Sequence, residues 1–334
     1  MNPKERVLVT GATGFLGLRT VEMLIDQGFP VRALVRRPSK AGTLAHLGAE
    51  IAQGDVTDPD SLKPAFEGID YVIHAAADTS GTEKGARQVT INGTRNILDL
   101  CASHQVKKLV YISSCSVYGS AEYKDGQVVD ENSPLEWFPE RRGIYSWAKL
   151  EAEKIVLDYM NQDKVPAVCI RPGTIYGPGG ENFSPMLGFS WKSKIFVVIQ
   201  KKGFTLPLVY IDNLVQAIIT ALVQEKSAGK VYNVVDPQRI GKKEYMDAFI
   251  RKLYPGAWCV YAPYGLLFPV VGLQQCLFGI LKRKPFLTRY RLASSQRSKI
   301  YDSSKIMDHL GWQPSFSFEQ AAVMIIEHEK STQN

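Results

Sequence analysis

The sequence predicts an α/β protein in which a doubly wound parallel sheet is followed by a smaller, mixed C-terminal lobe. Short apolar runs alternate with helical patterns from Val7 to Ile170, at a spacing typical of repeated strand–helix units. Three glycines spaced three apart, Gly11, Gly14 and Gly17, end the first run and open the first helical pattern. Beyond residue 177 the alternation breaks down, which indicates a region of different construction.

Length, charge and cysteine usage limit the classes of protein to be considered. The 334 residues are enough to bury a large core, and the N-terminus carries no apolar signal region. Lysine and arginine exceed aspartate and glutamate by 40 − 33 = 7, but the basic residues are dispersed and form no nucleic-acid motif. The cysteines lack CxxC pairs and the histidines lack ligand spacing, so we expect a reducing, cytoplasmic setting without disulfides or metal. The five cysteines are Cys101, Cys115, Cys169, Cys259 and Cys276.

The glycine-rich stretch, residues 7–17, has the order of a dinucleotide site: strand, tight turn and helix start. Gly11 permits the turn, Gly14 lets the backbone approach a pyrophosphate, and Gly17 lets the helix pack closely on the strand. The N-terminus of that helix offers free N–H groups and a partial positive charge to the phosphates. The alternative is a purely structural turn. The residues expected to bind cofactor here are Gly11, Thr13, Gly14, Phe15, Leu16 and Gly17.

The second strand, Val31–Val35, is followed by arginines where NAD sites place an acidic residue for the ribose 2′-hydroxyl. A guanidinium such as that of Arg36 grips a 2′-phosphate, whereas a carboxylate would repel it. We therefore expect NADP(H) as the cofactor, with NAD(H) as the alternative. The competing interpretation is a solvated basic loop formed by Arg36, Arg37, Ser39 and Lys40.

Two further strands are expected to end beside the cofactor. The third, residues 49–55, ends in an aspartate that either meets the adenine edge or caps the short helix beginning near Asp58. The fourth, residues 70–77, ends in small side chains that leave room for the cofactor across the sheet. Within it, His74 is expected to be a packed residue rather than a catalyst. The cofactor candidates at these two strand ends are Asp55, Val56, Ala75, Ala76 and Ala77.

The later pattern predicts a helix over 89–103, a fifth strand over 108–114, a polar loop over 121–142 and a sixth strand over 165–170. A strongly helical stretch runs from Tyr145 to Met160. The expected division is a dinucleotide-binding domain over 1–176, to which 209–235 returns, a substrate lobe over 177–208 and 236–315, and a C-terminal helix and tail over 316–334.

A tyrosine and a lysine at the start of that helix suit the chemistry of hydride transfer. Tyr145 and Lys149 are four apart and share one helix face, and Ser114 ends the fifth strand. Transfer of hydride to or from a nicotinamide needs a partner that moves the alcohol proton. A nearby ammonium is expected to lower the pKa of Tyr145, and Ser114 to donate a hydrogen bond to the substrate oxygen.

The most unusual composition lies between Trp258 and Leu281, where apolar residues dominate and Lys282-Arg283-Lys284 follows. Its length meets that of a membrane span, but Pro263, Pro269 and several glycines interrupt it. We expect an apolar lid or a flap over 258–284 that contacts an anionic membrane surface. The alternative is an ordinary pair of helices in the substrate lobe.

Several short motifs occur together, in order, along nearly the whole chain. They are the stretch 10–17, Asp55, the turn 74–77, Ser113-Ser114 before Val117-Tyr118-Gly119, Tyr145 with Lys149, the run 171–179, Asp212-Asn213, and the late stretch 310–314. Together they resemble the extended short-chain dehydrogenases/reductases, a group with a Rossmann-type sheet. The resemblance implies an enzyme that acts on a small-molecule substrate.

The resemblance also implies roles for individual residues. Tyr145 would be the acid/base, Lys149 its modulator and a ligand of the nicotinamide ribose, and Ser114 the donor to the carbonyl oxygen. Ser114 is preferred over Ser113 because it lies four residues before Tyr118, the spacing usual in the family. A homodimer through helices of the dinucleotide domain is common in the family. Further positions implied near the cofactor or active site are Asn92, Thr94, Pro172, Gly173, Thr174 and Ile175.

The C-terminal part is similar to the branch of 3β-hydroxysteroid dehydrogenases and sterol C4-decarboxylases, near long-chain β-keto acid reductases. The similarity rests on the runs 285–292 and 301–305, preceded by the apolar insertion. It implies a hydrophobic secondary alcohol or ketone, sterol-like or a β-hydroxy/β-keto acid. The alternatives are a nucleotide-sugar epimerase and, from another class, a protein that senses a dinucleotide without turnover. Arg291 and Arg297 suit either a carboxylate or a diphosphate.

Overall fold

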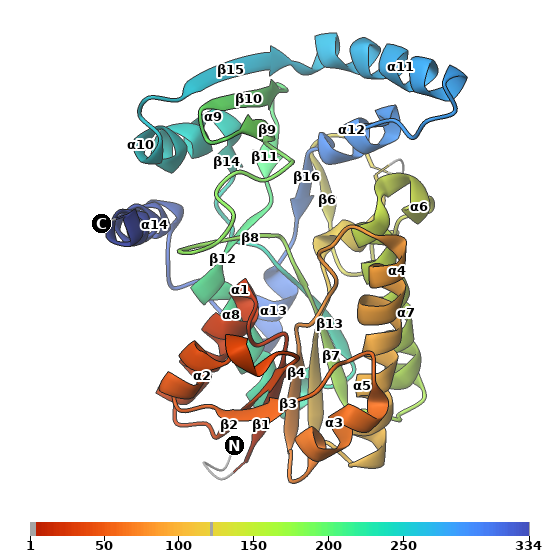
Figure 1. Ribbon diagram of the computed structural model, residues 1–334, viewed down its shortest axis with the longest axis vertical. Coiled ribbons are helices and arrows are strands. Elements are labelled where there is room, and N and C mark those ends of the chain that lie inside the picture. Colours follow the sequence, from red (N-terminus) through yellow and green to blue (C-terminus); the bar gives the residue numbers. More distant parts are fainter. Residues whose placement is uncertain (1–4, 121–122, 334) are drawn as a thin grey trace.

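A parallel sheet forms the centre of the molecule in the computed structural model, which describes residues 5–120 and 123–333 (Figure 1). Its seven strands lie in the order β13-β7-β5-β4-β1-β2-β3, and every neighbouring pair is parallel. The predicted doubly wound sheet is therefore confirmed. The strands are β1 (Val7–Thr10), β2 (Val31–Val35), β3 (Glu50–Gln53), β4 (Tyr71–His74), β5 (Lys108–Ile112), β7 (Ala167–Pro172) and β13 (Lys230–Val234).

Helices cover both faces of this sheet, as right-handed strand–helix–strand crossovers require. In Figure 1, α1, α2 and α8 lie on one side, and α3, α5 and α7 lie on the other. Both faces bury apolar side chains, which is why the central strands are continuous hydrophobic runs. The helices are α1 (Phe15–Asp26), α2 (Gly42–His46), α3 (Pro59–Phe66), α5 (Gly93–Ser103), α7 (Ile144–Asn161) and α8 (Ile211–Val223).

The strand order reverses between β1 and β4, and the carboxyl ends of these strands meet there. Ligands of open α/β sheets bind outside the carboxyl ends of the strands at such a switch point. The glycine turn (residues 11–17) follows β1, and the alanine turn (residues 75–77) follows β4. The two turns predicted from the sequence to contact the cofactor therefore lie side by side. The Ala76 N–H donates to Thr10 Oγ1 at 3.3 Å and ties them together.

A second group of small sheets and short helices lies above the carboxyl end of the central sheet in Figure 1. Its sheets are the three-stranded β15-β10-β9 and the pairs β11-β14, β12-β8 and β16-β6. The strands are β6 (Gln127–Val129), β8 (Thr174–Tyr176), β9 (Gly188–Trp191), β10 (Ile195–Gln200), β11 (Thr205–Leu206), β12 (Leu208–Tyr210), β14 (Ile240–Gly241), β15 (Trp258–Pro263) and β16 (Lys299–Tyr301). The helices of this group are α6 (Pro139–Arg142), α9 (Lys242–Tyr245), α10 (Arg251–Leu253), α11 (Tyr264–Ile280), α12 (Arg289–Ser295) and α14 (Phe318–Gln333), whereas α13 (Ser304–Leu310) packs on β13 and α8, and α4 (Glu83–Gly85) lies alongside α7.

Residues 211–234 return to the central sheet and are tied to it by two polar side chains. Asp212 accepts hydrogen bonds from Arg19 at 2.6 and 2.9 Å, which joins α8 to α1. Asn213 donates to Asp236 and accepts from the backbone of Phe316, both within 3.0 Å. The Asp212-Asn213 motif thus joins the start of α8 to α1 and to the segments that carry Asp236 and Phe316. The boundaries of the two lobes stay a prediction.

Three segments differ in detail from the sequence expectation. The helix expected over 89–103 begins earlier, as α4 and a π-helical stretch, Ala86–Asn92, that runs into α5. The loop expected over 121–142 holds β6 and α6 in its described part. Residues 258–263 form strand β15, because they pair in register with β10 and satisfy their backbone there.

Candidate active site

The glycine turn is built for close approach of backbone to backbone. Gly11 has φ +69°, a conformation that favours glycine, and a Cβ there would lie 2.7 Å from the Ala76 nitrogen. A Cβ on Gly17 would lie 2.1 Å from the Gly11 carbonyl oxygen, so only glycine lets α1 start this close to the turn. The α1 N-cap residue, Gly14, offers no side chain to the first-turn N–H groups. These N–H groups point to the carboxyl end of the sheet and fit a pyrophosphate.

The remaining residues of this turn divide between solvent and packing. Thr13 and Gly14 are exposed, whereas Phe15 and Leu16 are half-buried. The Phe15 ring fills the space over Gly180, where a Cβ would approach it to 2.6 Å. Phe15 therefore also fixes the loop 177–180 against the cofactor turn.

At the ends of β2 and β3, a basic and an acidic side chain lie next to each other. Arg36 Nε is 4.0 Å from Asp55 Oδ2, and 63% of the Arg36 side chain is exposed to solvent. The Asp55 carboxylate accepts from the N–H and hydroxyl of Thr57, while Asp58 caps α3. The capping alternative for Asp55 is therefore wrong, because Asp58 occupies that role. Val56 is buried and packs against Gly93.

The buried side chain of His74, on β4, links this strand to β1 and to the start of α5 through hydrogen bonds. Its Nδ1 lies 2.7 Å from Thr10 Oγ1 and its Nε2 lies 3.0 Å from Thr94 Oγ1, whose own hydroxyl donates to the Thr90 carbonyl. Burial lowers the pKa of His74 to about 3, and the Lys149 charge adds to the effect. His74 is thus a neutral packed residue, as expected. Ala75 to Ala77 follow it and are half-buried at the strand end.

Thr94 and Asn92, which the resemblance placed near the active site, have different surroundings. Thr94 is fully buried in the His74 network, whereas Asn92 is exposed at the end of the π-helical stretch. Such stretches recur at functional sites because one extra residue in the turn redirects the following side chains. This one packs against α7, and Arg87 lies 4.7 Å over the Trp147 ring.

Ser114, Tyr145 and Lys149 converge where β5 ends and α7 begins. The Ser114 side chain caps a short 3₁₀ turn by accepting from the Ser116 N–H at 3.0 Å, and it lies near enough to the Tyr145 hydroxyl to lower the pKa of that group. Lys149 is 4% exposed, and its ammonium donates to the Ile112 carbonyl at 2.8 Å. The order of β5, turn and helix therefore brings together three side chains that are separated by 35 positions in the sequence.

Burial has the largest effect on the pKa values of Tyr145 and Lys149. Desolvation of its hydroxyl raises the pKa of Tyr145, although 49% of the residue is exposed, and the nearby Ser114 side chain lowers this pKa by a smaller amount. Burial also lowers the pKa of Lys149 to about 8, although Cys169 and Glu153 act in the opposite direction. The expected lowering of the Tyr145 pKa is thus absent in the protein alone. The physical reason is that the Lys149 ammonium is bound to the Ile112 carbonyl while the phenolate would be desolvated.

Ser113, the neighbour of Ser114, is hydrogen-bonded to the buried ion pair of Glu153 and Arg171. Its hydroxyl donates to Glu153, which is fully buried on α7 and pairs with Arg171 at 2.5 Å. Arg171 also donates to the Tyr118 hydroxyl at 2.7 Å. This network fixes the register of α7 against β5 and β7, and so it places Tyr145 and Lys149.

The segment after β7 closes the cofactor side of the site. Pro172 ends the strand, and Gly173, Thr174 and Ile175 are half-buried beyond it. A Cβ on Gly173 would lie 2.3 Å from the Pro207 carbonyl oxygen, which also accepts from the Thr174 N–H at 2.6 Å. Pairing of β8 with β12 then fixes these backbone groups at the carboxyl end of the sheet.

Tyr145 opens onto a cavity of about 610 Å³ between α6, α7, α11 and α12. Some of its lining residues had no assigned role in the sequence analysis: Arg141 lay in the expected polar loop, Gln275 in the apolar segment, and Thr288 in the run 285–292. Of the two basic candidates from sequence, Arg291 lines this cavity, while Arg297 is not among its lining residues. The lining residues are Gly81, Glu140, Arg141, Gly143, Ile144, Tyr145, Gln275, Thr288, Tyr290 and Arg291.

Residues 7–234 match the family model described as NAD dependent epimerase/dehydratase family. The chain belongs to this family. It is 28% identical to "3beta-hydroxysteroid-dehydrogenase/decarboxylase isoform 1" of Arabidopsis thaliana, over 96% of this chain and 78% of the relative. It is 29% identical to "3 beta-hydroxysteroid dehydrogenase/Delta 5→4-isomerase" of Mycobacterium tuberculosis, over 95% and 88%. The solved structure of gox2253 matches with a TM-score of 0.81 and 27% identity, over 98% of this chain and 99% of that one.

Membership in the epimerase/dehydratase family makes this chain an extended short-chain dehydrogenase/reductase and an NAD(P)-dependent oxidoreductase. The 3β-hydroxysteroid dehydrogenase-like branch expected from the sequence is thereby confirmed. The family model covers the central sheet from β1 to β13 and ends before α11 and α12. The part of the chain that encloses the Tyr145 cavity from the C-terminal side therefore lies outside it.

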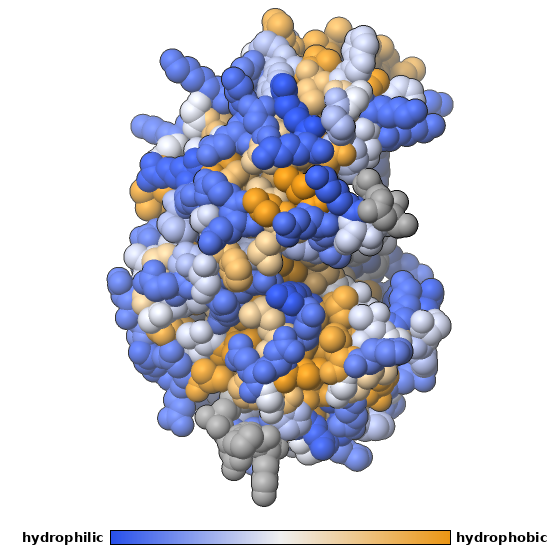
Figure 2. Space-filling model, turned by 90° about the vertical axis from the view of Figure 1, so that its left-hand side faces the viewer, coloured by the Kyte–Doolittle hydropathy of each residue, from blue (hydrophilic) through white to orange (hydrophobic). Residues whose placement is uncertain are grey.

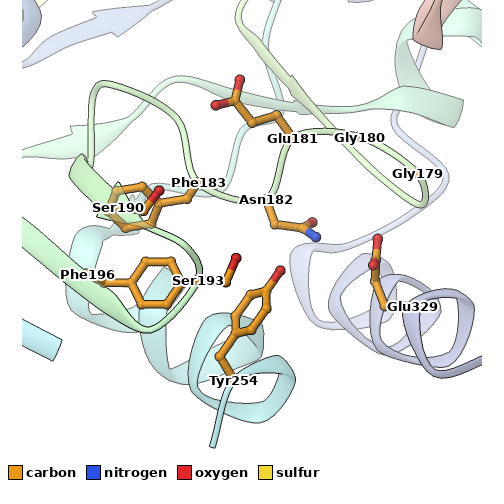
Figure 3. Close-up of a pocket in the computed structure, with 10 residues that line it drawn as sticks. All are labelled: Gly179, Gly180, Glu181, Asn182, Phe183, Ser190, Ser193, Phe196, Tyr254 and Glu329. Atoms are coloured by element: carbon orange, nitrogen blue, oxygen red, sulfur yellow. The ribbon is translucent and has the colours of Figure 1, made fainter. Parts of the chain in front are cut away.

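A second cavity, of about 350 Å³, lies away from the candidate site (Figure 3). Asn182, Ser193, Tyr254 and Glu329 point toward its centre from a loop, the β9–β10 turn, the end of α10 and α14. None of the predicted catalytic or cofactor residues lines it. We assign no part of the redox chemistry to this cavity, since it offers neither the glycine turn nor Tyr145.

Proposed function

We propose that the chain is an NADP(H)-dependent oxidoreductase that interconverts a secondary alcohol and a ketone on a hydrophobic substrate. The observation that carries this proposal is the position of Tyr145. Its hydroxyl lies near Ser114, close enough for that side chain to lower the pKa of Tyr145, and Tyr145 lines the 610 Å³ cavity. A substrate in the cavity would thus have its reacting oxygen within reach of both hydroxyls.

The proposed roles follow from these contacts. Ser114 donates to the substrate oxygen and Tyr145 exchanges the proton of that oxygen. Lys149, held by the Ile112 carbonyl, places a positive charge behind the tyrosine and binds the ribose next to the nicotinamide. The cofactor, when bound, supplies or accepts the hydride at the carbinol carbon. The glycine turn, Arg36, Asp55, the alanine turn and residues 172–175 would hold it across the sheet.

A substrate panel tests the proposal directly. Oxidation of NADPH is followed with a 3-ketosteroid, a long-chain 3-oxo ester and an aliphatic ketone, and epimerisation is followed with UDP-glucose. We expect turnover of at least one apolar ketone and none of the nucleotide sugar. Turnover of UDP-glucose alone would favour the epimerase alternative. Tight NADPH binding without oxidation by any ketone would favour the dinucleotide-sensing alternative.

The choice of cofactor is tested by Arg36→Asp. This change replaces a guanidinium by a carboxylate beside Asp55, so we expect the Kd for NADPH to rise by ~10- to 100-fold and that for NADH to change much less. Fluorescence titration with each cofactor measures both constants. Arg239→Asp, the same charge change at an exposed position between β13 and β14, is the control. Equal loss of both cofactors in Arg36→Asp would contradict the assignment.

The source of a hydrophobic substrate is suggested by α11, most of whose side chains lie outside the core. Gly272 is the only residue of this helix that is buried, because the Arg289 guanidinium packs flat against it. Figure 2 shows hydrophobic side chains gathered at the upper end of the molecule, where β15 and α11 lie. No helix in the described ranges is long and apolar enough to span a bilayer. The exposed apolar residues here are Trp258, Leu266, Val270, Leu273, Leu277, Ile280, Leu281 and Phe286.

We propose that this surface rests on an anionic membrane leaflet. Lys282, Arg283 and Lys284 are exposed at the end of α11, and Lys192 and Lys194 follow the exposed Trp191 in the β9–β10 turn. Basic side chains around an apolar face match the charge of anionic lipid headgroups. Because Gln275 of α11 also lines the Tyr145 cavity, an apolar substrate would pass from the leaflet to the cavity along this helix.

Vesicle sedimentation tests this membrane contact. The double variant Leu273→Glu and Ile280→Glu should lower partitioning onto phosphatidylglycerol vesicles by at least ~10-fold, since two exposed apolar side chains that would enter the leaflet become charged. Val323→Glu, at an exposed apolar position on α14, should partition like the parent. A parent protein that stays in the supernatant, or equal loss in both variants, would contradict the proposal.

A further inference from the structure

We infer that Arg141 and Arg291 form an anion site beside Tyr145, and that this site takes a carboxylate carried by the substrate. The inference rests on the proposed function and names its substrate class: a hydrophobic β-hydroxy or β-keto acid. Both guanidinium-bearing residues line the same cavity as Tyr145, and they come from different elements, α6 and α12.

Arg291 is placed against the first turn of the helix that carries Tyr145. A Cβ on Gly143 would lie 3.6 Å from Arg291 Nε and 3.8 Å from its Nη2. Gly143 has φ +129°, so its backbone conformation also favours glycine. The Arg291 guanidinium therefore lies beside Gly143, the N-cap of α7, two residues before Tyr145 in the sequence.

The helix that carries Arg291 is anchored through its neighbour. The Tyr290 hydroxyl donates to Glu136 Oε1 at 2.5 Å, and Glu136 is buried. The second carboxylate oxygen of Glu136 accepts from Arg142 at 3.4 Å, and Arg142 also donates to the Tyr118 carbonyl at 3.0 Å. Tyr290 and Arg142 thus serve to hold α12 against α6, which leaves the adjacent arginines to face the cavity.

Neither cavity arginine has a counter-ion among residues 5–120 and 123–333. Arg142 pairs with Glu136, but no salt bridge joins Arg141 or Arg291 to a carboxylate in that part of the chain. Arg141 stacks 5.0 Å over the Phe138 ring, which orients the guanidinium without neutralising it. Glu140 is the single acidic residue that lines the cavity with them. The cavity therefore presents a net positive charge to its contents.

A carboxylate fits the two arginines of this cavity better than a diphosphate does. A guanidinium donates two parallel hydrogen bonds to a carboxylate, and two guanidiniums fit its two oxygens. From α11, only Gln275 lines the cavity, and the exposed apolar side chains of the same helix, such as Leu273 and Leu277, suit a hydrocarbon tail that extends beyond the cavity rather than a nucleotide. In the reduction, the carbonyl carbon gains the hydride from NADPH and its oxygen gains the Tyr145 proton, while the carboxylate stays unchanged on the arginines.

The test compares an acid with its neutral ester in the oxidation direction, where both substrates are chemically stable. The probes are 3-hydroxydodecanoate and methyl 3-hydroxydodecanoate with NADP⁺. For Arg291→Gln and Arg141→Gln we expect KM for the acid to rise by ~10- to 100-fold, the loss typical of hydrogen bonds to a charged group. KM for the ester and kcat for both substrates should stay within ~2-fold of the parent, as for an interaction remote from the reacting atoms.

Two variants complete the design. Arg239→Gln, an exposed position between β13 and β14, removes the same charge outside the cavity and should leave both KM values unchanged. Arg291→Lys keeps the charge without the fork and should lose part of the preference for the acid.

The outcomes separate the inference from the function on which it rests. A parent that oxidises the ester as well as the acid, or variants that lose both substrates equally, would overturn the carboxylate site alone. Loss of UDP-glucose binding in Arg291→Gln, with the acid unaffected, would assign the arginines to a diphosphate instead. Failure of the parent to oxidise either alcohol, together with a negative ketone panel, would overturn the proposed function itself.

Discussion

Replacing Tyr145 by phenylalanine is expected to lower kcat by ~10²- to 10⁴-fold, the contribution usual for a positioned proton donor or acceptor. The substitution removes the hydroxyl that Ser114 contacts and keeps the ring that lines the cavity. We therefore expect NADPH to bind with nearly unchanged affinity. Steady-state rates with the preferred ketone and fluorescence titration of NADPH measure the two effects separately.

Tyr159→Phe is the matched control, since Tyr159 lies on the same helix and contacts Asp99 at the surface. Its turnover should equal that of the parent. The pH dependence gives a second readout. Oxidation needs the deprotonated Tyr145, and desolvation raises the pKa of Tyr145 above its ordinary value of 10, so the oxidation rate should still be rising at pH 10, whereas the reduction rate should fall only above that pH. Retention of near-normal turnover in Tyr145→Phe would remove this residue from the proposed mechanism.

Replacing Arg171 by methionine is expected to destabilise the fold by ~3–5 kcal/mol, the range for breaking a buried ion pair on one side. Arg171 and Glu153 have side chains only 3% and 0% exposed, so the remaining carboxylate would be buried without a counter-charge. The Tyr118 hydroxyl would also lose its donor from Arg171. Equilibrium unfolding in urea, followed by circular dichroism, measures the change in free energy of unfolding.

The double variant Arg171→Met with Glu153→Leu removes both charges and should recover most of the lost stability. Lys63→Met, which breaks the exposed pair with Asp60, should leave the urea midpoint nearly unchanged. If the single variant has the midpoint of the parent, or the double variant is no more stable than the single, then the pair does not hold α7 in the way described.

The sheet and the cofactor turn were predictable because their signals are local. Strand–helix alternation sets the order of the elements, and each strand reports its burial through a continuous apolar run. Gly11 and Gly17 are required by contacts within a few residues of sequence or with the adjoining strand end. Tyr145 and Lys149 are likewise related by the helical repeat alone. The edges of the apolar segment were less predictable, since β15 exists only by pairing with β10.

The arrangement of side chains in the candidate site depends on contacts between parts of the chain that are distant in sequence. Ser113 and Ser114 are adjacent and alike in sequence, but Glu153 takes the hydroxyl of Ser113 and leaves Ser114 beside Tyr145. Arg291 lines the cavity because Glu136 anchors Tyr290 from 154 positions away. The sequence by itself determined the sheet, its glycine turn and the helix face of Tyr145 and Lys149, because short-range periodicity encodes them. Only the tertiary structure decided which polar side chains hydrogen-bond to buried partners and which face the cavity, because those contacts depend on long-range packing.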